Sequence, residues 1–254
     1  MNPPGAHWTD GEDLDLVFLA SGNAGRLGCS AVPAHLRPTA AIAADAVLVG
    51  DPGRALLLAQ ELLEEPKMSN HARGLWGYSG QTPGGAALTI QATGIGGPSA
   101  ALVLGDLAGL GVRRVVRVGT CAGSGDCELG ELLLVSGAVA AGGSITSLGV
   151  TVGEMVAPDD DLTGQVLKAV ARSSRSVAIA SVDGHPGEQA PSPGIVATDM
   201  QTAPLLARAR SLGIEAAAML IVAEMAGGEA KLEKEALELI EKRAGRAASA
   251  ALSV

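Results

Sequence analysis

The sequence predicts an α/β fold of three layers, α/β/α, in which helices cover both faces of a mixed, mainly parallel central sheet. Two observations carry this prediction. Short apolar runs alternate with stretches of helical periodicity, and glycine-rich turns follow several of the runs. Strands that alternate with helices form sheets covered on both faces. Ligands bind at the carboxyl ends of such strands, so we expect a site at the glycine-rich turns.

Six apolar runs have the length and composition of buried strands. They cover residues 46–50, 87–93, 114–119, 132–139, 177–182 and 216–223. Between several of them, the helical spacing of apolar residues predicts helices over 53–65, 98–110, 162–171 and 202–212. A last helix is expected over 229–248, with apolar residues along one side at Leu232, Ala236, Leu239 and Ile240.

Residues 39–254 are expected to form a single domain, preceded by an N-terminal extension over residues 1–38. Prolines and glycines interrupt the pattern in the extension, where only residues 14–20 have the composition of one short element. Neither an internal repeat nor a low-complexity linker divides the rest of the chain. The domain is long enough to bury a substantial core.

The composition argues against several classes of partner. The 254 residues carry a formal net charge of -9 and only 2% are aromatic, whereas nucleic acids and anionic membranes require a basic face. The three cysteines, Cys29, Cys121 and Cys127, contain no CxxC pair, so we expect reduced thiols in a cytoplasmic protein and no metal site. No apolar run approaches the roughly 20 residues of a membrane span, and the N-terminus lacks the basic flank of a signal peptide.

The stretch VLVGDPGRA, residues 47–55, joins an apolar strand to a Gly-Asp-Pro-Gly-Arg turn. Glycine and proline by themselves indicate a tight turn before a helix. Arg54 adds a guanidinium close to the start of that helix, where the arginine fork and backbone N–H groups are able to hold one oxyanion. The turn is therefore a candidate anion site.

A second arginine, Arg117, lies inside the apolar run of RRVVRVGTCAGSG. Burial of an unpartnered guanidinium is unfavourable, so Arg117 needs a carboxylate, several carbonyl groups or a ligand anion. A structural salt bridge and an anion site both remain open. Arg73 of NHARGLWGYSG, taken alone, is typical of a solvated surface residue, and the glycines of ATGIGGPSA are explained equally well by close helix packing.

Four segments, in this order and spacing, resemble the bacterial purine nucleoside phosphorylase and uridine phosphorylase family. They are LVGDPGRA, RGLWGYSG, QATGIGGPSAALVLGDLAGLGVRRVVRVGTCAG and ELLLVSGAV. The resemblance implies the three-layer fold and reversible phosphorolysis, in which a nucleoside and phosphate give a free base and ribose 1-phosphate. It thus implies a pentosyltransferase of purine salvage with phosphate as co-substrate and no cofactor.

The resemblance also implies which residues bind phosphate. The family's Gly-Asp-Pro-x-Arg turn carries over to Gly50 and Arg54, and its Arg-x-Gly-Ser/Thr turn to Arg117 and Thr120. The arginine that a neighbouring subunit donates carries over to Arg73. Arg117 is also a candidate catalytic residue, because a phosphate dianion that it positions both stabilises the oxocarbenium character of the sugar and attacks it.

Residues near the nucleoside carry over less completely. In the purine branch an Asp or Asn after a late strand acts near the base, and Glu224 of LIVAEMAGG occupies that position. Glu224 is the candidate proton donor to the leaving base, with a cap at a strand end as the alternative. His185 of SVDGHPGEQ stands where the family has a stacking aromatic ring, and His35 matches a histidine that reaches a neighbour's ribose 5′-hydroxyl.

The ribose motif departs from the family's Glu-Met-Glu, since TDMQTAP has Asp199, Met200 and Gln201 instead. Met200 is expected against the sugar, and Gln201 replaces a glutamate that accepts from ribose hydroxyls. Hydrogen bonds to a charged acceptor are about twice as strong as neutral ones, so we expect weaker ribose binding or a changed sugar. Gln201→Glu is accordingly expected to raise activity on ribonucleosides. The Gln and Arg with which uridine phosphorylases hold uracil are not both present, which argues against uridine.

Two other functions stay open at this point. A hydrolytic nucleosidase uses water and needs no arginine cluster, whereas a catalytically degenerate paralogue fits Gln201, His185 and the short loop over 183–199. The resemblance further implies a homo-oligomer, a hexamer built as a trimer of dimers, because Arg73 and His35 are expected to serve a neighbour's site.

Overall fold

The structure is a computed structural model that describes residues 33–125, 127–170, 174–188, 194–228 and 230–254. The element expected over 14–20 lies outside the described residues. Packing begins before residue 39, because Leu36 is buried in the core and the Asp106 carboxylate accepts hydrogen bonds from the backbone N–H groups of residues 34–36. The packed domain therefore includes the last residues of the predicted extension.

Ten strands of the described chain form one mixed sheet. They are β1 (Asp45–Val49), β2 (Glu64–Asn70), β3 (Gly77–Gln81), β4 (Ala87–Ala92), β5 (Arg114–Gly123), β6 (Leu132–Ala140), β7 (Met155–Val156), β8 (Ser174–Ser181), β9 (Ala197–Asp199) and β10 (Glu215–Met225). Parallel pairing joins β1 to β4 and β5, and β5 to β10. The strands that end at the predicted glycine-rich turns are thus parallel neighbours, as the sequence predicts.

Half of the sheet closes on itself. Strand β5 pairs with β10, β10 with β6, β6 with β8, β8 with β9, and β9 returns to β5. We call these five strands the strand ring. Four other strands extend the sheet from β5 through β1, β4 and β3 to β2, and β7 pairs with β6.

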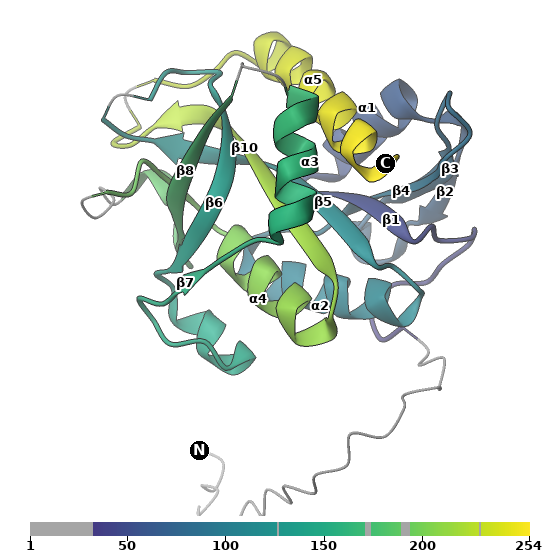
Figure 1. Cartoon of the computed structure of the whole chain (residues 1–254), viewed down its shortest axis with the longest axis horizontal. Helices are drawn as coiled ribbons and strands as arrows, with labels where there is room; N and C mark the ends of the chain where they lie inside the picture. Colours follow the sequence, from purple (N-terminus) through teal and green to yellow (C-terminus); the bar gives the residue numbers. More distant parts are fainter. Residues whose placement is uncertain (1–32, 126, 171–173, 189–193, 229) are drawn as a thin grey trace, which may run out of the picture.

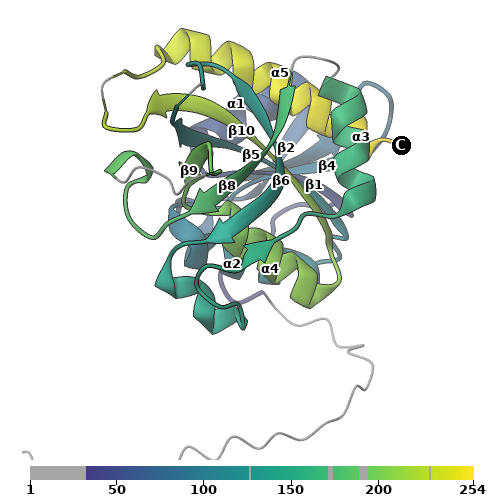
Figure 2. The same cartoon turned by 60° about the vertical axis from the view of Figure 1, so that its left-hand side comes forward.

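In the described part of the chain, five α-helices cover the two faces of the sheet, which confirms the predicted three-layer arrangement (Figure 1). They are α1 (Pro52–Leu62), α2 (Gly96–Gly109), α3 (Asp160–Val170), α4 (Thr202–Leu212) and α5 (Lys234–Leu252). Helices α2 and α4 lie together on one face, and α1, α3 and α5 lie on the other, as the turned view in Figure 2 also shows. Short 3₁₀ helices lie at Ala72–Gly74, Gly143–Leu148 and Pro186–Glu188.

The last helix differs from its prediction in start and in buried side. It begins at Lys234 rather than 229, and Leu239 is 68% exposed. The buried side carries Gly245 and several alanines instead, because α5 packs close to α1. A Cβ at Gly245 would lie 2.7 Å from Leu58 Cδ2. Small residues therefore set this contact, where larger apolar residues were expected.

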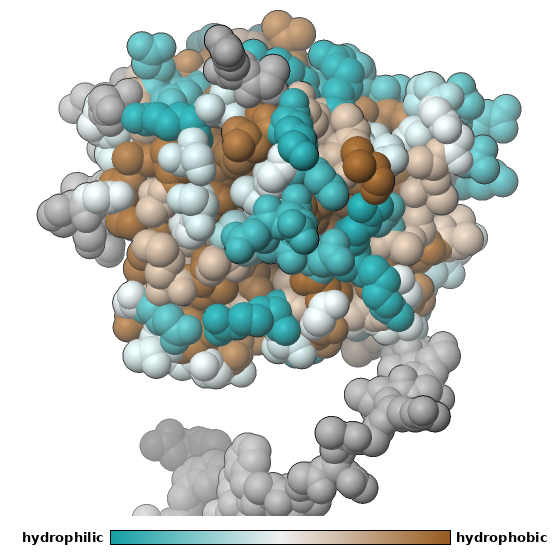
Figure 3. Space-filling model, in the orientation of Figure 1, coloured by the Kyte–Doolittle hydropathy of each residue, from teal (hydrophilic) through white to brown (hydrophobic). Residues whose placement is uncertain are grey.

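The core lies between the sheet and its two helical layers. Leu104, Leu133 and Leu220 belong to the cluster under α2 and α4, whereas Leu58 and Ile221 belong to the cluster under α1, α3 and α5. Hydrophilic residues lie over α3 on the surface (Figure 3), opposite its buried face. Among the described residues, no helix combines the length and the hydrophobicity that crossing a bilayer requires.

Candidate functional site

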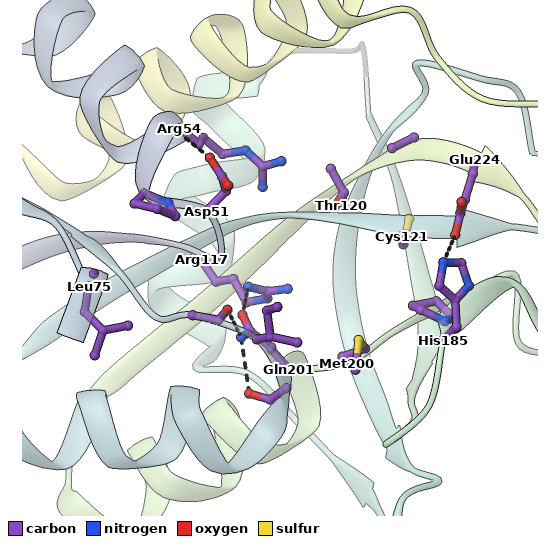
Figure 4. Close-up of a pocket in the computed structure, with 18 of the residues that line it drawn as sticks. Asp51, Arg54, Leu75, Arg117, Thr120, Cys121, His185, Met200, Gln201 and Glu224 are labelled. Atoms are coloured by element: carbon purple, nitrogen blue, oxygen red, sulfur yellow. Dashed lines mark hydrogen bonds and ion pairs between the residues drawn. The ribbon is translucent and has the colours of Figure 1, made fainter. Parts of the chain in front are cut away.

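A cavity of about 590 Å³ lies where several strands of the sheet end. Its wall is formed by the turn after β1, the turn after β4, the middle of β5, and the ends of β9 and β10. Nine of the predicted site residues line this cavity: Gly50, Arg54, Arg73, Arg117, Thr120, His185, Met200, Gln201 and Glu224. In Figure 4, Arg54 and Arg117 lie on one side and His185 and Glu224 on the other, with Met200 between them.

Arg54 lies in the first turn of α1. The Asp51 carboxylate caps this helix by accepting the Arg54 backbone N–H at 2.9 Å, so that N–H group is used by the protein itself. The Arg54 side chain donates through Nε to Glu241 Oε1 of α5 at 2.5 Å. Burial raises the pKa of the Glu241 carboxyl, although the Arg54 guanidinium acts in the opposite direction. Glu241 therefore holds the guanidinium by its Nε, with the terminal nitrogens beyond that contact.

Arg117 lies on β5, facing the layer of α2 and α4, and is only 4% exposed. Its Nη2 donates to Asp199 Oδ2 at 2.9 Å, its Nη1 to Gln201 Oε1 at 2.7 Å and its Nε to Thr202 Oγ1 at 3.1 Å. These contacts use three of the five N–H groups of a guanidinium. Arg117 thus has the structural salt bridge that the sequence left open, and it also lines the cavity.

Thr120 and Cys121 follow Arg117 on β5 and line the cavity. Burial raises the pKa of the Cys121 thiol well above its ordinary value, and its Sγ donates to the Ile221 backbone carbonyl. A thiol in this state is a poor nucleophile, because the thiolate is the reactive form. The half-buried Thr120 hydroxyl is therefore the group on this stretch with chemistry to offer a ligand.

Glu224 lies near the end of β10, beyond an irregularity in the pairing of β10 with β5. Such bulges redirect side chains, and here the consecutive residues Ala223 and Glu224 both line the cavity. Lys231 Nζ lies 3.3 Å from Glu224 Oε2, and His185 Nε2 lies 3.6 Å from Glu224 Oε1. This side of the cavity therefore holds a carboxylate between an ammonium and an imidazole.

The orientation of the His185 ring follows from a backbone contact. The Gly187 N–H donates to His185 Nδ1 at 3.2 Å. In neutral imidazole the nitrogen that accepts carries no proton, so Nε2 carries it and directs it toward Glu224. The ring is half exposed. The imidazole that was expected to stack on a base is therefore in contact with Glu224.

Gln201 lies in the cavity wall, where the sequence places it, but its amide is bonded to the protein. Its Oε1 accepts from Arg117 and from Thr93 Oγ1, and its Nε2 donates to the backbone carbonyls of Gly94 and Gly96. Met200 precedes it and also lines the cavity. The amide's four protein partners have no sequence signature, because three of them come from the turn after β4.

Two predicted residues lie at or beyond the edge of the site. Arg73 is exposed in the 3₁₀ helix before β3, with the left-handed φ of 59°, and borders the cavity of its own chain. His35 is not among the residues that line the cavity, and its Nδ1 lies 3.7 Å from Asp106 Oδ2 on α2. That Arg73 and His35 contact the ligand in a neighbouring subunit's site stays a prediction.

Three charged partners of site residues were missed by the sequence reasoning. They are Asp199, Glu241 and Lys231. A signal existed for Glu241, which is a charged residue on the apolar side of the last helix, between Leu237 and Ala244. None existed for the Lys231 contact, because it depends on how the chain turns back after β10.

Most of the chain matches known proteins. Residues 45–254 match the model of the phosphorylase superfamily. A "Purine nucleoside phosphorylase DeoD-type" of Limosilactobacillus reuteri (strain DSM 20016) is 30% identical over 213 residues, which are 77% of this chain and 87% of that protein. A second "Purine nucleoside phosphorylase DeoD-type", of Oceanobacillus iheyensis, is 39% identical over 99 residues. This match covers 38% of this chain and only 42% of that relative's length.

A solved structure shares the fold. The crystal structure of a uridine phosphorylase from Vibrio fischeri ES114 matches with a TM-score of 0.71 at 20% sequence identity. The match covers 84% of this chain and 92% of that one. At this identity the similarity shows the arrangement of the elements and leaves the choice between purine and pyrimidine open.

Proposed function

The chain belongs to the phosphorylase superfamily, and we propose that it cleaves the N-glycosidic bond of a purine nucleoside with phosphate. The products are the free base and ribose 1-phosphate, or the 1-phosphate of the corresponding sugar. The observation that carries this proposal is a single cavity with two guanidinium groups, Arg54 and Arg117, on one side and an acid–base pair, His185 and Glu224, on the other.

The arginine side of the cavity suits a phosphate dianion. Glu241 engages only the Nε of Arg54, and two of the five N–H groups of Arg117 remain beyond its contacts with Asp199, Gln201 and Thr202. The Thr120 hydroxyl adds a donor, and Gly50 brings backbone to the cavity wall. Fixed guanidinium groups position and stabilise an anion without reorganisation during the reaction.

The reaction needs each side of the cavity for a different step. The bond between C1′ of the sugar and the base nitrogen breaks, and its electron pair leaves with the base. A phosphate oxygen, held by the arginines, forms the new bond to C1′ and stabilises the positive charge that develops there. The departing base takes a proton or a hydrogen bond at the side where Glu224 lies.

The choice of a purine rests on the groups near Glu224. A leaving purine spreads its negative charge over the imidazole ring, and a single carboxyl group that donates to that ring neutralises it. Glu224 lines this side of the cavity and donates in its protonated form, and the His185 ring beside it offers a face to the base. Among the described residues that line the cavity, this side offers no guanidinium and no uncommitted amide to hold the two carbonyl groups of uracil.

Base release from inosine, adenosine, guanosine and uridine, each with and without phosphate, tests the proposal. Release of purine bases only with phosphate supports it. Release without phosphate makes the protein a nucleosidase, and faster release from uridine makes it a uridine-type phosphorylase. Absence of release from every substrate, by a folded protein, would identify a paralogue that has lost the activity.

We also propose that the active form is a homo-oligomer, a hexamer assembled as a trimer of dimers. The support is an apolar surface beside the cavity: Ile95 of the cavity wall is 83% exposed, and Leu102 of α2 is also exposed. Arg73 is exposed at the same rim. Sedimentation velocity of the wild type and of Ile95→Glu tests this, since the variant is expected to dissociate, and a monomeric wild type with full activity would contradict it.

A further inference from the structure

We propose that Asp199 is a positioning residue for phosphorolysis: its carboxylate fixes the direction of the Arg117 guanidinium and offsets the positive charge of that group. Asp199 itself is not among the described residues that line the cavity. The inference rests on the proposed function, because it takes Arg117 as part of the phosphate side of the site. It gives a residue behind the cavity wall a role in the reaction.

Several donors hold the Asp199 carboxylate in place. Asp199 is 1% exposed, and its Oδ1 accepts from the Ser181 hydroxyl at 2.5 Å. Its Oδ2 accepts from the Thr202 hydroxyl at 2.6 Å and from the Thr202 backbone N–H at 3.0 Å. Thr202 is the first residue of α4, and the N-terminus of a helix favours a negative charge. The carboxylate is therefore a fixed and buried acceptor.

This acceptor sets the direction of the Arg117 guanidinium. Asp199 Oδ2 accepts from Arg117 Nη2 at 2.9 Å, and the Thr202 hydroxyl that donates to Oδ2 accepts from Arg117 Nε at 3.1 Å. One N–H of Nη1 donates to Gln201. One N–H on Nη1 and one on Nη2 then lie outside these contacts. A carboxylate and a hydroxyl behind the cavity wall thus determine which N–H groups of Arg117 are left for phosphate.

The same carboxylate offsets a buried positive charge. Burial lowers the pKa of the Arg117 guanidinium, and Asp199 is the neighbour that opposes this most strongly. Arg54, on the same side of the cavity in Figure 4, also lowers the pKa of Arg117. Arg54 has a carboxylate of its own, the buried Glu241 of α5. Each guanidinium on the phosphate side is therefore paired with a buried carboxylate, and the formal charges of these four groups cancel.

This pairing matters for the reaction because phosphate has to stabilise the positive charge that develops on the sugar. Guanidinium groups without counter-ions would neutralise the phosphate dianion and bind it tightly before the reaction begins. Binding that is stronger in the ground state than in the transition state slows the chemical step. A guanidinium that already has a counter-ion orients the phosphate and leaves its negative charge available to the sugar. Asp199 accordingly favours turnover over tight phosphate binding.

Asp199→Asn keeps the size of the side chain and removes its charge. We expect kcat of phosphate-dependent base release to fall by about 100-fold, since a displacement of about 1 Å in a positioning group has an effect of this size. We expect inorganic phosphate to bind more tightly, because it becomes a counter-ion of Arg117. Isothermal titration calorimetry at fixed ionic strength, without nucleoside, measures its Kd. A folded variant with unchanged kcat, or with unchanged or weaker phosphate binding, overturns the proposal.

Asp45→Asn is the matched control, because it breaks another Asp–Arg pair. Asp45 accepts from Arg114 at 2.8 Å and 2.7 Å, and neither residue lines the cavity. We expect this variant to have a lower Tm but wild-type kcat and phosphate Kd when it is assayed well below its Tm. A loss of kcat in Asp45→Asn equal to that in Asp199→Asn would overturn the proposal, since any broken salt bridge would then have the same effect.

A milder pair of variants decides the question if Asp199→Asn does not fold. Thr202→Val removes the hydroxyl that lies between Asp199 and Arg117, whereas Thr202→Ser keeps a hydroxyl there. We expect kcat to fall by about 10-fold in Thr202→Val, as for the loss of a hydrogen bond to a charged group, and to stay at the wild-type value in Thr202→Ser. Equal kcat in the two variants overturns the proposal.

The two readouts also separate this inference from the function on which it rests. If the wild type releases no base with phosphate, the proposed function fails, but tighter phosphate binding by Asp199→Asn still supports the counter-ion role of Asp199. If the wild type and Asp199→Asn release base equally fast with phosphate, the proposed function stands and this inference fails.

Discussion

Arg117 has both features that its sequence position left open: it forms a structural salt bridge, and it lines the cavity proposed to bind an anion. Its burial inside an apolar run correctly indicated a residue that needs partners, and the structure provides Asp199, Gln201 and Thr202. Residue type and position thus located the cationic side of the site. They could not reveal which groups hold the guanidinium, because those groups come from about 80 residues later, in a segment brought close by the short strand β9 and by the packing of α4 against α2.

Gly119 is required by the space that the Arg117 guanidinium occupies. A Cβ at this position would lie 2.5 Å from Arg117 Nη2 and 2.7 Å from its Cζ. We expect Gly119→Ala to destabilise the fold by about 1–3 kcal/mol through overpacking. Displacement of the guanidinium by an ångström is expected to lower phosphate-dependent base release by about 100-fold.

Urea unfolding and steady-state kinetics check this prediction. Gly143→Ala is the control, because a Cβ there meets no atom within 4 Å. A Gly119→Ala enzyme with wild-type turnover would show that the position of Arg117 is unimportant for the reaction.

Glu224 is the second residue whose role is open to direct test. We expect Glu224→Gln to lower turnover of purine nucleosides by about 100-fold or more, since general acid catalysis contributes about 10²–10⁴. The KM for phosphate should stay unchanged, because Glu224 lies across the cavity from Arg54. Glu215→Gln, at the exposed start of the same strand, is the matched control. Unchanged turnover of Glu224→Gln would leave this residue a structural role only.

At the level of elements, periodicity predicted the buried strands and most helices well but missed β2, β3, β7 and β9. β2 reads EEPKMSN, whose charges and proline suit an exposed edge rather than a buried strand. The strand β3 contains two glycines, and β7 and β9 have only two and three residues. The bulge that brings both Ala223 and Glu224 to the cavity has no sequence signature, because it depends on pairing with β5.

Helix α2 holds the segment before β1 through one carboxylate. Burial alone raises the pKa of Asp106, but the hydrogen bonds from the backbone N–H groups of Leu36, His35 and Ala34 outweigh it and lower the pKa. We expect Asp106→Asn to reduce the free energy of unfolding by about 1.5–3 kcal/mol at neutral pH, as hydrogen bonds to charged groups do.

The lowered pKa of Asp106 also determines how this difference in unfolding free energy changes with pH. A carboxyl with a lowered folded-state pKa stabilises above its unfolded pKa, about 3.9, and loses that contribution as the pH falls through the folded value. The difference between wild type and Asp106→Asn should therefore be full at pH 7 and shrink below about pH 4. Asp161→Asn, an exposed carboxylate on α3, is the control. A difference that stays constant from pH 7 to pH 3 would contradict the assignment.

For the whole molecule, the alternation of strands and helices was sufficient to predict three layers and a site at the strand ends. It was insufficient to predict the strand ring, because closure is decided by which non-consecutive strands pair. The pairings of β9 with β5 and β8 involve only four residue pairs, yet they complete the ring. Local sequence carries no information on contacts of this kind.

The strand ring also divides the molecule by how readily its backbone amides exchange with solvent. Strand β5 is hydrogen-bonded to β1, β9 and β10, whereas β2 pairs with β3 alone among the described strands. We expect the β5 amides to be among the slowest to take up deuterium and those of β2 to exchange through local opening. Hydrogen–deuterium exchange mass spectrometry measures this, and equal rates in β2 and β5 would contradict it. The segment that carries Arg117 and Thr120 then keeps its backbone hydrogen bonds while the hairpin of β2 and β3 opens.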